Sequence, residues 1–156
     1  MIVWRIGTET PDYPADDLNG NGAKLTGGRW NKKGLAVVYC SQTIALAVLE
    51  TIVHFGQWGL PLNRYLVEIR IPDDVWQSRA QGSPPAGWDA VPEGMGSIIY
   101  GSDWLVSGAS AVLEVPSVIV PEERNVLLNP RHADCSRVTG TTVRRWGYDH
   151  RLRAQK

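Results

Sequence analysis

The chain has 156 residues, of which 43% are hydrophobic and 21% charged, a composition typical of soluble globular proteins rather than disordered, fibrous or membrane proteins. Sixteen Lys and Arg balance sixteen Asp and Glu, so the formal net charge of zero gives no support to direct nucleic-acid binding or to a membrane surface. Cys40 and Cys135 form no C-x-x-C motif, the first residues lack a secretory pattern, and no apolar run approaches the ~18 residues of a membrane span. We therefore expect one domain over residues 1–156, in the reducing cytoplasm.

The first part of the chain predicts two strands separated by a long loop. Residues 3–6 have the pattern of a short strand, and residues 7–28 are rich in glycine and proline. A loop of this length is usually functional or mobile. Residues 35–39 form an apolar, β-branched run between Gly34 and Ser41, which predicts a buried strand.

A helix after this strand is the strongest secondary-structure prediction. Apolar side chains recur at helical spacing on one face, at Ile44, Val48, Ile52 and Phe55. We expect Ser41 to cap its N-terminus and Gly56 to end it.

The remaining chain predicts further strands and one long connection. Residues 64–71 alternate as a half-buried strand does, and residues 81–96 are rich in glycine and proline, which fits either a surface connection or a flap. Short strands are expected at 111–115, 118–120 and 126–128, between prolines. One main helix, placed after the second strand, predicts an α+β fold with mixed or antiparallel sheets rather than a doubly wound parallel sheet.

Several common motifs are missing from the sequence. No G-x-G-x-x-G lies between a strand and a helix, and the Gly22 to Gly27 spacing of a phosphate loop lacks its lysine. The three histidines have no metal-ligand spacing, and no G-x-S-x-G surrounds Ser117. We expect no metal, no redox use of a nicotinamide cofactor, and no nucleophilic serine.

Three local clusters carry candidate chemistry. In GGRWN, residues 27–31, Arg29 can grip a diphosphate, although an arginine in a surface turn has the same pattern. Glu50 shares a polar helix stripe with Thr43 and His54, which faces either solvent or a cleft, and Tyr39 ends the preceding strand. Ser117, with Asn129 downstream, either orients a ligand or completes hydrogen bonding at strand ends.

Together these motifs resemble the RES domain family, over about residues 4–152. The matching segments, in order, are GGRWN (27–31), VVYCS (37–41), ALAVLETIVH (45–54), VPSVIVPEERNVLLNP (115–130) and WGYDHRL (146–152). The family is named after an arginine, a glutamate and a serine, which match Arg29, Glu50 and Ser117. Arg124 and Ala133 depart from the residues common at those positions, which concerns local loop geometry.

The resemblance implies a fold similar to ADP-ribosyltransferases and a toxin of a bacterial toxin–antitoxin pair that depletes NAD. NAD would be a substrate rather than a cofactor, cleaved between nicotinamide and ribose. Glu50 would stabilise the ribosyl cation, Arg29 would grip the phosphates, and Tyr39 would support nicotinamide or ribose, with Ser117, Trp30 and Asn31 completing the substrate site.

The acceptor of the ADP-ribosyl group stays open at this point. Water or phosphate would give a glycohydrolase or a phosphorolytic enzyme, and a protein acceptor would give an ADP-ribosyltransferase. A non-catalytic partner-binding module is the alternative from another class, whereas zero net charge and the lack of a histidine pair disfavour a ribonuclease. The implied partner is an Xre-type helix-turn-helix antitoxin in a hetero-oligomer. The basic end of the chain, residues 144–156 with the short tail 153–156, is either solvated or binds an acidic surface of that antitoxin.

Overall fold

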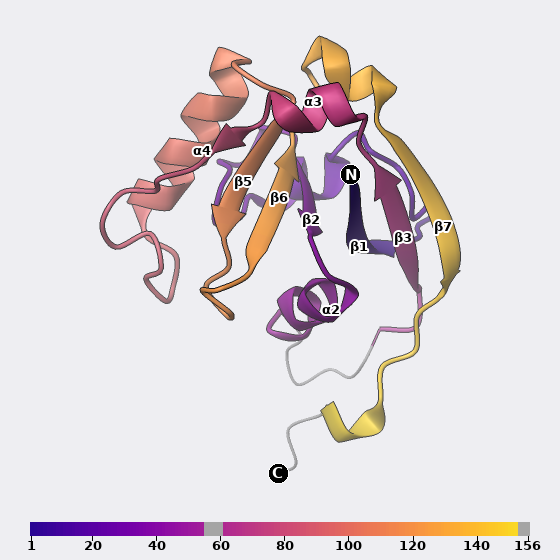
Figure 1. The fold of residues 1–156 in the computed structure, drawn as a ribbon. Coiled ribbons are helices and arrows are strands. Elements are labelled where there is room, and N and C mark those ends of the chain that lie inside the picture. The colour runs from indigo at the N-terminus through magenta and orange to yellow at the C-terminus, as the bar shows by residue number, and fades with distance from the viewer. Residues whose placement is uncertain (55–60, 153–156) are drawn as a thin grey trace.

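The computed structural model describes residues 1–54 and 61–152, and its centre is one seven-stranded mixed sheet (Figure 1). The strand order is β4-β5-β6-β2-β1-β3-β7, with all neighbours antiparallel except the parallel pair β4 and β5. The strands are β1 (Ile2–Thr8), β2 (Val38–Ser41), β3 (Arg64–Arg70), β4 (Ala80–Gln81), β5 (Val112–Pro116), β6 (Arg124–Leu128) and β7 (Thr139–Arg145). The expected α+β class with a mixed sheet is confirmed, whereas the likeness to ADP-ribosyltransferases stays a prediction.

The sheet is joined at its middle by very little pairing. β1 pairs with β3 along its whole length, from Ile2 opposite Arg70 to Thr8 opposite Arg64. Between β1 and β2, the register contains the single pair Trp4 and Ser41. The two halves of the sheet are therefore joined through this one pair in the ladder.

Helices cover both faces of the sheet. They are α1 (Asn21–Thr26), α2 (Ile44–Ile52), α3 (Asp73–Gln77), α4 (Met95–Ser107) and the 3-10 helices η1 (Ala133–Arg137) and η2 (His150–Leu152). Val75 of α3 and Cys135 of η1 pack in the core on one face. On the other face, α4 and α2 belong to two separate apolar clusters. In Figure 1, α2 and α3 lie at opposite ends of the sheet, and α4 lies beside β5.

The main predicted helix exists, but its N-terminal boundary was wrong. Thr43, in extended conformation, is the N-cap, and its hydroxyl accepts a hydrogen bond from Leu46 N at 3.1 Å. Ser41 instead ends β2, where its hydroxyl has another partner. The helix ends at Ile52, and the predicted positions of Phe55 and Gly56 lie outside the described residues.

The prediction of one main helix was also wrong, because α4 is longer than α2. Its buried residues include Trp104 and Leu105, but Ser97, Gly101 and Ser102 are small or polar, so the sequence shows no continuous apolar stripe. The small residues allow close packing: a Cβ on Gly101 would lie 2.1 Å from the carbonyl oxygen of Trp30. Close packing against residues 27–31 requires small residues in α4, and small residues give no apolar periodicity in the sequence.

Three other local predictions are corrected. The 7–28 loop begins within β1 and contains α1. Residues 118–120 form a bend, because the Ser117 hydroxyl accepts hydrogen bonds from Ile119 N and Val120 N and so turns the chain. The basic end starts later than expected: residues 144 and 145 belong to β7, and Trp146 and Tyr148 pack against the α2 cluster.

Candidate active site

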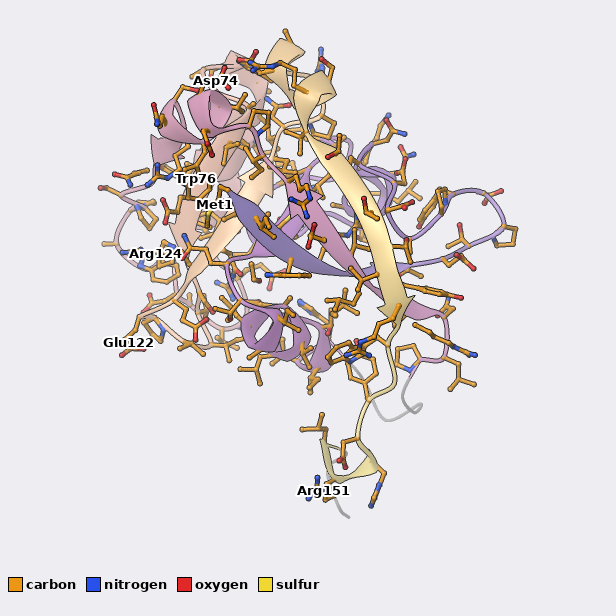
Figure 2. The ribbon with its side chains drawn as sticks, turned by 45° about the vertical axis from the view of Figure 1, so that its right-hand side comes forward. Met1, Asp74, Trp76, Glu122, Arg124 and Arg151 are labelled. Atoms are coloured by element: carbon orange, nitrogen blue, oxygen red, sulfur yellow. The ribbon has the colours of Figure 1, made fainter. Side chains whose placement is uncertain are left out.

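A cleft of about 840 Å³ lies where α2, the segment 26–30, residues 91–93 and the β5–β6 connection meet. Its size is in the range of ~300–1,000 Å³ that is usual for small-molecule sites. The wall includes Arg29, Trp30, Tyr39 and Glu50, so four of the six predicted site residues come together. Figure 2 labels Glu122 in the β5–β6 connection and Arg124 at the start of β6, near the same end of the molecule as α2.

Glu50 enters the cleft from α2 and is held by one of its two carboxylate oxygens. Ser117 Oγ donates a hydrogen bond to Oε1 at 2.8 Å, and Asn125 Nδ2 donates to the same atom at 2.5 Å. Among the described residues, no donor is within hydrogen-bond distance of Oε2. The arrangement thus fixes the carboxylate and leaves one oxygen for a ligand in the cleft.

Ser117 lies behind Glu50 rather than on the cleft wall. Its side chain is 0% exposed, and its Oγ accepts hydrogen bonds from Ile119 N and Val120 N, each at 3.1 Å. A hydroxyl that accepts two bonds has its single proton left to donate, and here the proton points to Glu50. This position orients the carboxylate, whereas we had expected a direct contact with substrate.

The Tyr39 hydroxyl joins the β2 strand to the 27–31 segment. It donates to Asn31 Oδ1 at 2.7 Å and accepts a hydrogen bond from Trp30 N at 3.1 Å. Burial raises the pKa of Tyr39 well above that of a free phenol, because desolvation disfavours the phenolate. Tyr39 is therefore a neutral donor and acceptor in the cleft wall.

Two further predicted substrate residues are buried. Asn31 is 1% exposed and lies off the cleft wall, and its Nδ2 donates to the carbonyls of Ala23, Lys32 and Leu35. Trp30 contributes to the wall but is only 2% exposed. Asn31 is thus placed to hold Tyr39 and the local loop, not to touch a ligand.

Arg29 connects the cleft to the 82–94 loop, which we call the flap. Its Nη1 donates to the carbonyl oxygens of Trp88 at 2.9 Å and Ala90 at 2.8 Å. The rings of Trp30 and Trp88 stack with centroids 6.0 Å apart. Nε and Nη2 of Arg29 have no hydrogen-bond partner in the described part of the chain, so this edge of the guanidinium is available to an anionic ligand.

The wall also includes residues that sequence reasoning missed, among them Ser41, Asn125 and Arg5. Asn125 lies in the same family segment as Asn129, which we had noted instead. Asn129 is a structural residue, because it is 1% exposed and its Nδ2 donates to Leu105 O at 3.0 Å. Arg5 was detectable as an arginine within an otherwise apolar strand; its Nη1 donates to Asp17 O at 2.8 Å.

The described residues contain neither a metal-binding cluster nor a membrane-spanning helix. Across residues 1–54 and 61–152, no group of three or more His, Cys, Asp or Glu side chains is arranged to hold a metal ion. In the same residues, no helix has the length and hydropathy needed to cross a bilayer.

Comparison with known proteins places the chain in a family. The RES domain profile matches residues 2–149. A Prs ADP-ribosylating toxin of Sphingobium sp. (strain YBL2) is 55% identical over 96% of this chain and 94% of its own. Two proteins named Toxin Res are 39% and 37% identical, from Yersinia enterocolitica (85% of this chain, 86% of the relative) and Photorhabdus laumondii (97% of each). The chain belongs to the RES domain family, as the motifs predicted.

Proposed function

We propose that this protein is a toxin that cleaves NAD between the nicotinamide nitrogen and C1′ of the adjacent ribose, and transfers the ADP-ribosyl group to a protein. The observation that carries the proposal is the Glu50 carboxylate, anchored through Oε1 with no hydrogen bond to Oε2 from residues 1–54 and 61–152, in a cleft that also contains Arg29. Family membership and the name of the 55% identical relative support the same chemistry.

The first half-reaction breaks the C1′–N bond, and its electron pair leaves with neutral nicotinamide. Positive charge then develops on C1′ and the ring oxygen, and a fixed carboxylate close to the sugar stabilises that charge. Glu50 supplies this carboxylate and accepts a hydrogen bond from a ribose hydroxyl. The free edge of Arg29 pairs with the diphosphate, and Tyr39 supports the nicotinamide end.

The second half-reaction differs only in the nucleophile that attacks C1′ and then loses its proton. The name of the Sphingobium relative favours a protein acceptor. Water or phosphate as acceptor would instead deplete NAD, through the same first half-reaction and the same glutamate. We retain NAD depletion as the second candidate because the features of this cleft serve both reactions.

The family resemblance also suggests the partner and the place of action. We propose that an Xre-type helix-turn-helix antitoxin binds the protein in a hetero-oligomer and that the toxin acts in the cytoplasm. NAD is a consumed substrate in this scheme, and no other cofactor is required.

The test is incubation of the purified protein with NAD, without antitoxin, followed by mass spectrometry of the products. Parallel reactions contain phosphate or no phosphate. A further reaction contains, as the acceptor, purified Prs, the protein that the name of the Sphingobium relative gives as its target. We expect nicotinamide release and a mass increase on Prs, and a fall of about 10²–10³ in rate for Glu50→Gln, which keeps the shape of the side chain but loses its charge. Glu122→Gln, at an exposed turn residue, is the matched control. Cleavage by Glu50→Gln at the wild-type rate would refute the proposal.

A further inference from the structure

The Glu50 carboxylate is held by a hydrogen-bonded chain that begins in the middle of the sheet. Ser41, at the end of β2, donates its hydroxyl proton to Asn125 Oδ1 at 2.7 Å, and Asn125 Nδ2 donates in turn to Glu50 Oε1. Ser41 and Asn125 are directly opposite in the register of β2 and β6. They are 2% and 9% exposed, so water competes little for these bonds.

The Ser41 hydroxyl determines which end of the amide faces the glutamate. An asparagine side chain can present either its nitrogen or its oxygen, and the surrounding hydrogen bonds select between them. Because Ser41 donates to Oδ1, the NH₂ group is directed at Glu50. The reversed amide would place its oxygen against the carboxylate, with repulsion in place of a charge-assisted hydrogen bond.

Asn125 and Ser117 act on the same carboxylate oxygen from two different segments of the chain. Both donate to Oε1, which fixes the rotation of the carboxylate as well as its position. Oε2 accepts no hydrogen bond from the described residues and is left for a ligand. The geometry thus divides the two oxygens into one for anchoring and one for the reaction.

We propose that Ser41 and Asn125 are positioning residues, which hold Glu50 so that Oε2 meets the reacting ribose; this inference rests on the proposed function of Glu50. Reacting groups must be held within ~3–3.5 Å for efficient reaction, and a misplacement of ~1 Å costs about 100-fold in rate. Ser41 acts through Asn125, so its loss lowers kcat and leaves KM unchanged.

The test compares Ser41→Ala, which removes the hydroxyl, with Ser41→Thr, which keeps a hydroxyl on a strand residue. Ser110→Ala is the matched control, because Ser110 is another buried serine, hydrogen-bonded to Trp104 Nε1 and Val112 O, that is not on the cleft wall. Two measurements are made: NAD cleavage kinetics, and the NMR signal of the Asn125 side-chain amide in ¹⁵N-labelled protein. Loss of this signal in Asn125→Ala assigns it.

In the wild type and in Ser41→Thr, we expect one Asn125 amide proton far downfield, as a short bond to a carboxylate requires, and similar kcat. In Ser41→Ala, the proton should move toward the position of free amides and kcat should fall about tenfold at constant KM. Ser110→Ala should leave both unchanged. If the Asn125 amide signal does not change in Ser41→Ala, Ser41 does not orient the amide. If the signal changes but kcat does not, Ser41 and Asn125 do not position Glu50 for the reaction. A wild-type protein that does not cleave NAD refutes the proposed function instead, and the amide signal still decides whether Ser41 orients Asn125.

Discussion

Arg29 Nη1 donates a hydrogen bond at 2.9 Å to the main-chain carbonyl oxygen of Trp88, which lies 59 residues later in the sequence. The same nitrogen bonds the carbonyl of Ala90. A residue expected to grip phosphates therefore also holds the flap through Nη1, while Nε and Nη2 form no hydrogen bond with the part of the chain that the structure describes. One side chain thus contacts both residues of the flap and the cleft.

Arg29→Lys keeps the positive charge but loses the planar fork of donors. We expect faster proteolysis within residues 82–94 and a KM for NAD that rises about tenfold, since one interaction with a charged group is lost in each case. Limited proteolysis and steady-state kinetics measure the two effects. Arg70→Lys, at a residue paired with Glu68 on β3, is the control. A raised KM with an unchanged rate of flap cleavage would show that Arg29 contacts the substrate but does not hold the flap.

Ser117→Ala tests whether this serine acts on Glu50 or on the substrate. The change removes one donor from Glu50 Oε1 and the acceptor of two backbone N–H groups. We expect kcat to fall about tenfold and KM to stay within about twofold, because the buried hydroxyl lies off the cleft wall. Ser136→Ala, at an exposed serine in η1, is the control. An increase in KM with kcat unchanged would restore the substrate contact that the sequence suggested.

Gly101→Ala tests the close packing of α4 against the 27–31 segment. The new Cβ would overlap the Trp30 carbonyl oxygen at 2.1 Å, so we expect a loss of about 1–3 kcal/mol in the free energy of unfolding. Gly96→Ala, in the same helix, places its Cβ 3.4 Å from Pro85 Cγ and should cause no loss. Urea unfolding of the two variants gives the comparison. Equal stabilities would mean that α4 does not pack this closely.

Stability at alkaline pH follows from two buried thiols. Burial raises the pKa of Cys40 to about 12 and that of Cys135 to about 11, above the ordinary thiol value of 9.0. Between about pH 9 and the native pKa values, the unfolded chain loses protons that the native protein keeps, so this contribution to stability is complete below about pH 9 and falls as the pH rises.

We therefore expect the free energy of unfolding to fall between pH 8 and pH 10 by about 1 kcal/mol for each thiol. Urea unfolding at both pH values measures the fall, and Cys40→Ala should reduce it whatever its effect at pH 8. The same fall in the double variant Cys40→Ala/Cys135→Ala would assign it to other groups. Tyr39, whose pKa is also raised, contributes mainly above about pH 10 and so beyond this range.

The sequence predicted those features whose signal is local. Ile44 and Val48 pack partly buried against the core as predicted, although the most buried residues of α2 are Leu46 and Ala47, and the strands at the centre of the sheet have apolar, β-branched runs. Arg29, Tyr39 and Glu50 were found through family motifs, and the structure places all three on one cleft. Their roles in catalysis stay predictions until they are tested.

The missed features depend on contacts between distant segments. Gly101 has a place in α4 because of Trp30, and Asn125 has a partner in Ser41, 84 positions earlier in the chain. A serine before a helix fits an N-cap as well as a strand end. Here the Ser41 hydroxyl is hydrogen-bonded to Asn125 on another strand, and Thr43 is the N-cap instead. Periodicity within one segment contains no information about such pairs.

The single residue pair that joins β1 to β2 gives Ser41 a double importance. It closes the seam between the two halves of the sheet opposite Trp4, and its hydroxyl begins the chain of hydrogen bonds to Glu50. Any movement that separates β2 from β6 at Ser41 would break the hydrogen bond to Asn125 Oδ1. The Asn125 amide would then no longer hold the Glu50 carboxylate in its orientation. The weak junction between β1 and β2 and the anchor of the glutamate therefore meet at Ser41, and the bond to Asn125 lies across the better-paired boundary between β2 and β6.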